Sequence, residues 1–193
     1  MSDSTVKTGS ASMIKSCIAP LVALLICLAI DRLSKAWALA NLPLSHPVPY
    51  IPGLLNFTLT TNTGAAFSMG HQNGLLMTIL ATTLTTLLFA WISSRIARRE
   101  LIPLPELLGI GCLLGGSLGN LIDRYMLGRV TDFLDIALFP FPVFNFADVF
   151  IDVGLALILI ARMRSPSHAC AQAEVVSAKD KSEKRQNLAE SSE

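Results

Sequence analysis

Four long apolar segments dominate the pattern of hydrophobic and polar positions along the chain. A helix needs about 20 residues to cross the roughly 30 Å hydrocarbon core of a bilayer. The second and third segments have about this length, with Glu106 near the start of the third, whereas charged residues interrupt the first and the fourth. The pattern predicts an all-α membrane protein with four transmembrane helices, at about residues 13–40, 74–93, 104–122 and 147–162.

The first apolar segment has two interpretations. Its most apolar stretch, 17–30, is followed by the small residues at 38–40, an order that also occurs in cleavable signal peptides. Arg32 and Lys35 lie between the two, which argues against cleavage, and their long stems can extend to the membrane interface. We therefore expect this segment to be retained as a membrane span.

Lysine and arginine mark one side of the predicted membrane. The connection 41–73 contains neither, and the connection 123–146 has two arginines mixed with three aspartates. Cytoplasmic connections are enriched in lysine and arginine, so both termini are predicted to be cytoplasmic and these two connections to face outward. The cytoplasmic group comprises Lys7, Lys15, Arg95, Arg98, Arg99, Arg162 and Arg164.

The first outer connection also contains a strand signal. Leu55, Phe57 and Leu59 alternate with polar residues, which is the period of a strand with one buried face. We expect a small β-sheet on the outer, periplasmic side of the membrane. The segments 1–12 and 165–193 are polar and are predicted to be disordered and cytoplasmic, which leaves 13–164 as the membrane domain.

Composition supports a membrane protein and excludes several functions. Apolar residues make up 52% of the chain and charged residues only 15%, against about 25% in ordinary soluble domains. A net charge of +1 gives no basic field for nucleic acid. There is no Cys-x-x-Cys pair and no histidine cluster, so we expect no metal site and no cofactor.

Five aspartates are the candidate functional residues. An ionisable group at membrane depth is costly and is a functional candidate by default. Asn145 has the spacing of a helix N-cap for Asp148, which is a sufficient structural explanation for that residue alone, whereas Asp132 has none. The predicted topology places all five near the outer surface: Asp31, Asp123, Asp132, Asp148 and Asp152.

Two carboxyl groups that share a site can hydrolyse an amide. When they lie close together one keeps its proton, so that the ionised group can accept a proton from water while the other hydrogen-bonds the carbonyl under attack. Ion or proton coupling in a transporter is an alternative use, although such proteins often have repeated halves and the chain has none. A non-catalytic assembly partner is a third possibility, because Gly111, Gly115 and Gly119 form a face suited to helix docking.

Five sequence blocks, in order, resemble the bacterial lipoprotein signal peptidases, also called signal peptidase II. The resemblance covers about 13–164 and omits both terminal segments. The blocks are 31–35 (DRLSK), 62–68 (NTGAAFS), 116–124 (GSLGNLIDR), 130–133 (VTDF) and 144–148 (FNFAD).

The resemblance implies a four-span aspartyl endopeptidase of the bacterial inner membrane, with its active site facing the periplasm. It implies cleavage of prolipoproteins on the amino side of a cysteine that carries diacylglycerol, with membrane lipid as surroundings and a monomer as the expected state. Asp132 and Asp148 match the catalytic pair. Substrate-binding positions match Asn62, Asn120, Arg124 and Asn145, and structural positions near the site match Asp31, Lys35, Gly64, Asp123 and Ala147.

Asp152 departs from the family pattern. It lies one helical turn from Asp148 on the same predicted face, at a position that is usually not acidic in the family. We expect Asp148 to be the catalytic residue, because it alone fits the Asn-x-Ala-Asp block. Asp152 either raises the pKa of Asp148 by like-charge repulsion or only lines a polar pocket.

Overall fold

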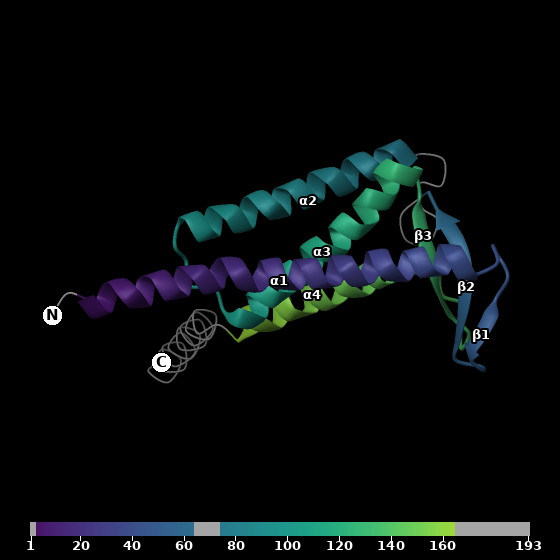
Figure 1. The fold of residues 1–193 in the computed structure, drawn as a ribbon, viewed down its shortest axis with the longest axis horizontal. Helices are drawn as coiled ribbons and strands as arrows, with labels where there is room; N and C mark the ends of the chain where they lie inside the picture. Colours follow the sequence, from purple (N-terminus) through teal and green to yellow (C-terminus); the bar gives the residue numbers. More distant parts are fainter. Residues whose placement is uncertain (1–2, 64–73, 165–193) are drawn as a thin grey trace, which may run out of the picture.

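The computed structural model describes residues 3–63 and 74–164, with side chains from Cys17 onward. It contains four helices and three strands within these ranges (Figure 1). The elements are α1 (Asp3–Asn41), β1 (Val48–Ile51), β2 (Leu55–Asn62), α2 (Gly74–Ala97), α3 (Leu104–Leu127), β3 (Val130–Ile136) and α4 (Phe146–Met163).

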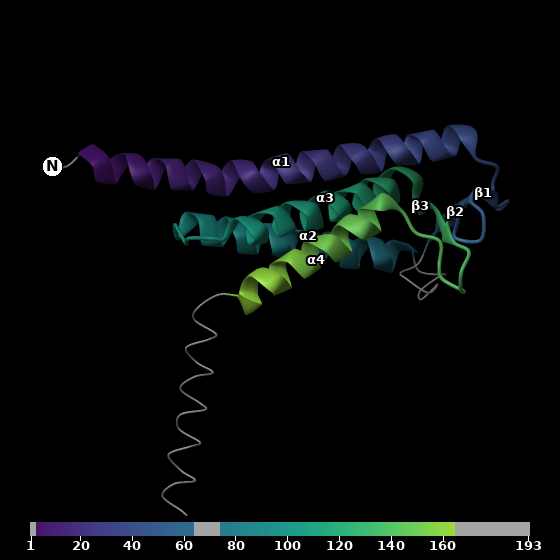
Figure 2. The same ribbon diagram turned by 90° about the horizontal axis from the view of Figure 1, so that it is seen from below.

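Helix α3 is the centre of the bundle, with α1 and α4 packed closely against it (Figure 2). Its glycines permit this contact. A Cβ atom added at Gly115 would lie 2.8 Å from the Leu24 carbonyl oxygen of α1, and one at Gly109 would lie 2.7 Å from the Gly154 carbonyl oxygen of α4. The predicted glycine face is therefore confirmed as a face for helix packing, here within one chain.

Three of the helices are long and apolar enough to cross a membrane: Cys17–Asn41 of α1, Gly74–Ala97 of α2 and Leu104–Leu127 of α3. Many large apolar side chains on α1 and α2 point outward, as expected where lipid surrounds a helix. The fourth helix has 18 residues and carries Asp148, Asp152 and Arg162. The chain is thus a mostly helical, multi-pass membrane protein.

A three-stranded antiparallel sheet, in the order β1-β2-β3, lies at one end of the bundle (Figure 1). The predicted strand is present as β2, but its burial does not alternate: Leu59 is buried, whereas Leu55 and Phe57 are half-buried like the polar residues between them. The rings of Trp37 and Tyr50 both contact Phe57. Contacts between β3, α1 and α3 connect the sheet to the helices and place β3 beside the ends of the bundle.

The boundaries differ from expectation at the amino terminus. Helix α1 already begins at Asp3, within the segment 1–12 that was expected to be disordered. The predicted tail, 165–193, and Gly64 lie outside the described residues.

A buried ion cluster connects the helices at the end away from the sheet. The Glu106 side chain is only 2% exposed and accepts from Arg95 of α2 and from Arg162 of α4, the latter at 2.9 Å. Both arginines also lie over the ring of Trp91. The cluster holds α2, α3 and α4 together at this end.

Candidate active site

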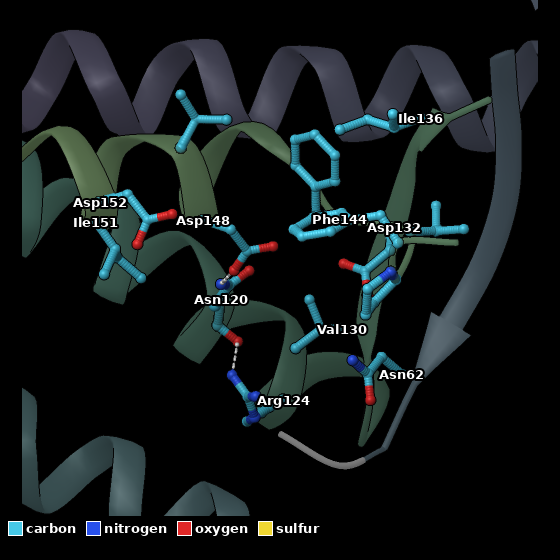
Figure 3. Close-up of a pocket in the computed structure, with 14 residues that line it drawn as sticks. Asn62, Asn120, Arg124, Val130, Asp132, Ile136, Phe144, Asp148, Ile151 and Asp152 are labelled. Carbon is cyan, nitrogen blue, oxygen red and sulfur yellow. Dashed lines mark hydrogen bonds between the residues drawn. The ribbon is translucent and has the colours of Figure 1, made fainter. Parts of the chain in front are cut away.

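A cavity of about 440 Å³ opens where α3, α4 and β3 meet (Figure 3). Its apolar wall includes Phe141, Pro142 and Phe144 from the connection between β3 and α4. Its polar wall contains five of the six residues predicted to be catalytic or substrate-binding, together with Asp152: Asn62, Asn120, Arg124, Asp132 and Asp148.

Asp132 lies within β3 and is 2% exposed. Its Oδ1 accepts a hydrogen bond from Asn145 Nδ2 at 2.6 Å, and Asn62 donates a second hydrogen bond to the carboxyl. Burial, reinforced by the charge of Asp148, raises the pKa of Asp132 to about 6, although the two hydrogen bonds and the charge of Lys35 act in the opposite direction. Asp132 is therefore a carboxyl that retains its proton at unusually high pH.

Asp148 is held at the first turn of α4 by a capping box. Asn145 Oδ1 accepts from the Asp148 backbone N–H, and Asp148 Oδ2 accepts from the Asn145 backbone N–H, each at 3.1 Å. Asn120 Nδ2 donates to the other carboxyl oxygen, Oδ1, at 2.8 Å. Both oxygens of Asp148 thus face N–H donors, an arrangement that suits the ionised form.

Asn145 connects the two carboxyl groups and is itself fully buried. Its backbone N–H binds Asp148, while its side-chain amide binds Asp132 and, at 3.1 Å, Asn120 Oδ1. The predicted N-cap is confirmed, and the same residue also fixes the partner carboxyl. A single asparagine therefore sets the relative position of Asp132 and Asp148.

A buried lysine lies beneath this arrangement. Lys35 Nζ contacts Asp31 Oδ1 at 3.0 Å, Asp123 Oδ2 at 3.2 Å and Asn120 Oδ1 at 2.9 Å. Arg32 forms a further ion pair with Asp123. Lys35, Asp31 and Asp123 are each at most 1% exposed, so their charges are compensated by one another inside the protein.

The two buried carboxylates also bind the backbone beside each site aspartate. Asp123 Oδ2 accepts from the Thr131 N–H at 3.1 Å, and Asp31 Oδ1 accepts from the Ala147 N–H at 3.2 Å. These are the residues directly before Asp132 and Asp148. The lysine cluster thereby positions both segments that carry the site.

The structure assembles the predicted residues that it describes. Asp123 and Arg124, although adjacent in sequence, have different surroundings: Asp123 binds Lys35 and Arg32, while Arg124 lines the cavity. The apolar lining residues Val130, Ile136 and Val143 were not predicted as site residues. The apolar run around Asp132 was the only signal for them.

The donor set favours acid–base chemistry over metal binding. Among the side chains of residues 17–63 and 74–164, no three His, Cys, Asp or Glu residues gather in a way that could hold a metal ion. A protonated carboxyl and an ionised carboxyl on one cavity wall can together polarise a carbonyl group and accept a proton from water.

Comparison with known proteins gives one consistent family. The family model described as signal peptidase (SPase) II matches residues 23–164. The lipoprotein signal peptidase of Thermosynechococcus vestitus is 42% identical over 137 residues, which cover 68% of this chain and 83% of that protein. That of Coxiella burnetii is 41% identical over 144 residues, covering 72% and 85%.

The fold has solved relatives as well. A structure described as a bacterial membrane enzyme, obtained by the in meso method, matches with a TM-score of 0.66 and 27% identity. The match covers 76% of this chain and 93% of the other. A second structure with the same description matches with the same TM-score and 26% identity.

Proposed function

The chain belongs to the signal peptidase II family and is an aspartic-type peptidase that cleaves signal peptides from lipoprotein precursors, and we propose that Asp132 and Asp148 are its catalytic pair. One observation carries this proposal. Asn145 donates hydrogen bonds to both carboxyl groups, so that residues from two separate elements meet at the wall of one cavity.

The two carboxyl groups have different roles in the proposed reaction. Asp132, with its raised pKa, holds a proton, hydrogen-bonds the carbonyl oxygen of the scissile amide and transfers the proton to that oxygen as water adds. Asp148, ionised, takes a proton from the attacking water, whose oxygen bonds to the carbonyl carbon. Asp148 then gives this proton to the leaving nitrogen as the C–N bond breaks, and Asp132 recovers its own from the collapsing diol. No covalent enzyme intermediate forms.

The polar lining residues position the substrate for this reaction. Asn62, Asn120 and Arg124 present amide and guanidinium donors to the cavity, which suits an extended peptide with free carbonyl groups. Asn145 is fully buried behind this wall, where its side-chain amide donates to Asp132 and its backbone N–H donates to Asp148, so it positions the pair and does not contact the substrate. Holding the amide beside the pair removes much of the entropic cost of the reaction.

The substrate is a prolipoprotein cleaved on the amino side of a cysteine that carries diacylglycerol. Acyl chains keep such a precursor in the bilayer and bring the scissile amide to interface depth. The cavity lies at the end of the helices beside the sheet, and its apolar wall of Phe141, Pro142 and Phe144 is compatible with lipid.

The chain crosses the bacterial inner membrane four times. Helix α4 spans about 27 Å at 1.5 Å per residue, and its acidic residues lie within its first two turns. The arginines between α2 and α3 and after α4 lie at the end away from the sheet. Cytoplasmic ends are enriched in lysine and arginine, which supports a cytoplasmic location for that end and a periplasmic location for the site and the sheet. The enzyme acts as a monomer.

A cleavage assay tests the catalytic pair. Purified wild-type protein, Asp132→Asn and Asp148→Asn are incubated with a precursor peptide, with and without diacylglycerol on its cysteine. We expect wild type to cleave only the lipidated peptide and each variant to lose at least about a thousandfold in kcat. Asp135→Asn is the matched control, because Asp135 lies on the same strand but binds Thr58 outside the cavity. Normal cleavage by either dyad variant contradicts the proposal.

A further inference from the structure

Asp152 is a carboxylate without a protein partner. It lies on α4 one turn beyond Asp148, lines the same cavity and is exposed. Throughout the part of the chain whose side chains are described, it makes no hydrogen bond or ion pair. A charge that far into a membrane-spanning helix is costly unless a ligand or water compensates it.

The cavity has a positive end and a negative end along the axes of α3 and α4. Helices α3 and α4 run antiparallel, with Gly116 facing Ala147 and Gly109 facing Gly154, and Asn120 binds Asp148 at one level. Four residues further along each helix, Arg124 lies toward the sheet and Asp152 lies in the opposite direction. At 1.5 Å per residue their backbones are about 12 Å apart along the axis. Figure 3 shows the side chain of Asp148 between those of Arg124 and Asp152.

Amide hydrolysis creates one group that fits Asp152. The water oxygen remains on the carbonyl carbon as a carboxylate, and the nitrogen of the cysteine leaves with a proton and becomes a primary amine. An α-amino group has an ordinary pKa of about 7.7–8.0, so it is largely a cation at neutral pH. The diacylglyceryl group offers only ester and thioether acceptors, so a carboxylate cannot bind it by hydrogen bonding.

We propose that Asp152 binds the α-ammonium group that cleavage frees on the lipidated cysteine, on the bilayer side of the catalytic pair. The proposal rests on the function argued above. It also assigns a direction to the substrate, with the amine side of the scissile bond toward Asp152 and the carbonyl side toward Arg124. An ammonium held at Asp152 has no lone pair with which to attack the new carboxyl group, so the reverse reaction is suppressed.

Product inhibition tests this role. A synthetic peptide with an amino-terminal diacylglyceryl cysteine is added to the cleavage assay, either with its amino group free or with that group acetylated. We expect wild type to be inhibited roughly fivefold to tenfold more strongly by the free amine, because only this form can make a charge-assisted hydrogen bond. In Asp152→Asn the preference is lost, and in Asp152→Glu it is kept.

Two outcomes overturn the proposal. One is an Asp152→Asn variant that still prefers the free amine; the other is a wild-type enzyme that does not distinguish the two peptides. Asp135→Asn serves as the control variant and is expected to retain the preference. If the proposed function itself were wrong, wild type would not cleave the lipidated precursor at all, so this result is distinct from the loss of a preference between the two peptides. A purely structural role for Asp152 would weaken inhibition by both peptides equally.

Discussion

The buried charge of Lys35 determines how its acidic neighbours can exist inside the protein. Asp31 and Asp123 are both within contact of its Nζ and are almost completely buried. Removing one partner of a buried ion pair leaves an uncompensated charge, which typically costs about 3–5 kcal/mol. The same cluster holds Thr131 and Ala147, so its loss should displace the proposed catalytic residues Asp132 and Asp148 that follow them.

We therefore expect Lys35→Met to lower the free energy of unfolding by about 3 kcal/mol or more and to reduce kcat strongly. Thermal unfolding in detergent and the cleavage assay measure the two effects. Combining Lys35→Met with Asp31→Asn and Asp123→Asn removes the stranded charges and should recover part of the stability. A triple variant less stable than Lys35→Met would show that charge compensation is not the role of Lys35.

The raised pKa of Asp132 predicts the alkaline side of the pH profile. Below about 6 this carboxyl holds its proton, and as the pH rises through about 6 it is ionised. The proposed mechanism requires the protonated form, so kcat/KM should fall with an apparent pKa near 6 in the free enzyme. The stability of the fold should depend on pH in the same direction. The protonated Asp132 contributes its full stabilisation below the ordinary carboxyl pKa, and this stabilisation is lost as the pH rises through the pKa of Asp132 in the folded state.

Asn62→Ala tests the cause of this pKa. The hydrogen bond from Asn62 lowers the pKa of Asp132, so its loss should move the alkaline limb of kcat/KM to higher pH. Thr58→Val is the matched control on the same strand, because Thr58 binds Asp135 and does not line the cavity. A limb that moves to lower pH in Asn62→Ala would contradict the assignment.

The two residues of the proposed catalytic pair could be inferred from the sequence. The distant residues that hold them in position could not. Asp148 follows a recognisable N-cap, Asn145, and Asp132 is an unexplained acid in an apolar stretch. The bond from Ala147 to Asp31 joins residues 116 positions apart, and no local pattern encodes such a contact. The role of Asp31 in holding the start of α4 therefore appears only in three dimensions.

Among the elements, β2 and β3 show why one strand was predicted and the other was not. Strand β2 alternates between apolar and polar residues, which is a distinctive period. Strand β3 is buried along its first five residues, so its sequence lacks the alternation of apolar and polar residues that identifies a strand with one exposed face. Its pairing with β2, which places Asp132 opposite Thr60, depends on residues far away in the chain.

Close packing on helix α3 at Gly119 affects the site, because Gly119 contacts Asp31, which holds the start of α4. At Gly119 an added Cβ atom would overlap the carboxylate of Asp31, whose Oδ2 is buried and has no hydrogen-bond partner among the residues that the structure describes. We expect Gly119→Ala to displace Asp31, to lower the melting temperature by several degrees and to reduce activity through the start of α4. Differential scanning fluorimetry and the cleavage assay provide the measurements.

Gly74→Ala is the matched control for this substitution. A Cβ atom at Gly74 would meet its nearest neighbours at 3.6 Å, which is ordinary van der Waals contact. This variant should retain its melting temperature and activity. Equal effects of the two substitutions would show that glycine content, and not the contact with Asp31, limits stability.

In the whole molecule, polar chemistry is divided between the two ends of an apolar bundle. The cavity of the proposed active site and the sheet occupy one end, and the Glu106 cluster with the exposed arginines occupies the other. The hydropathy pattern predicted the apolar spans between them, because lipid contact requires continuous apolar sequence. The sequence did not predict the ion cluster around buried Glu106, because its partners Arg95 and Arg162 come from two other helices.

This division makes the orientation of the protein testable in intact cells. In a cysteine-free background, Leu138→Cys introduces a thiol at an exposed position near the cavity, and Arg98→Cys introduces one at the opposite end. The excess of lysine and arginine at the end away from the sheet predicts that this end is cytoplasmic. A membrane-impermeant maleimide should therefore label Leu138→Cys in spheroplasts and label Arg98→Cys only after permeabilisation. The reverse pattern would place the catalytic pair in the cytoplasm, on the side away from the acyl chains of an exported precursor, and would exclude the proposed geometry of cleavage.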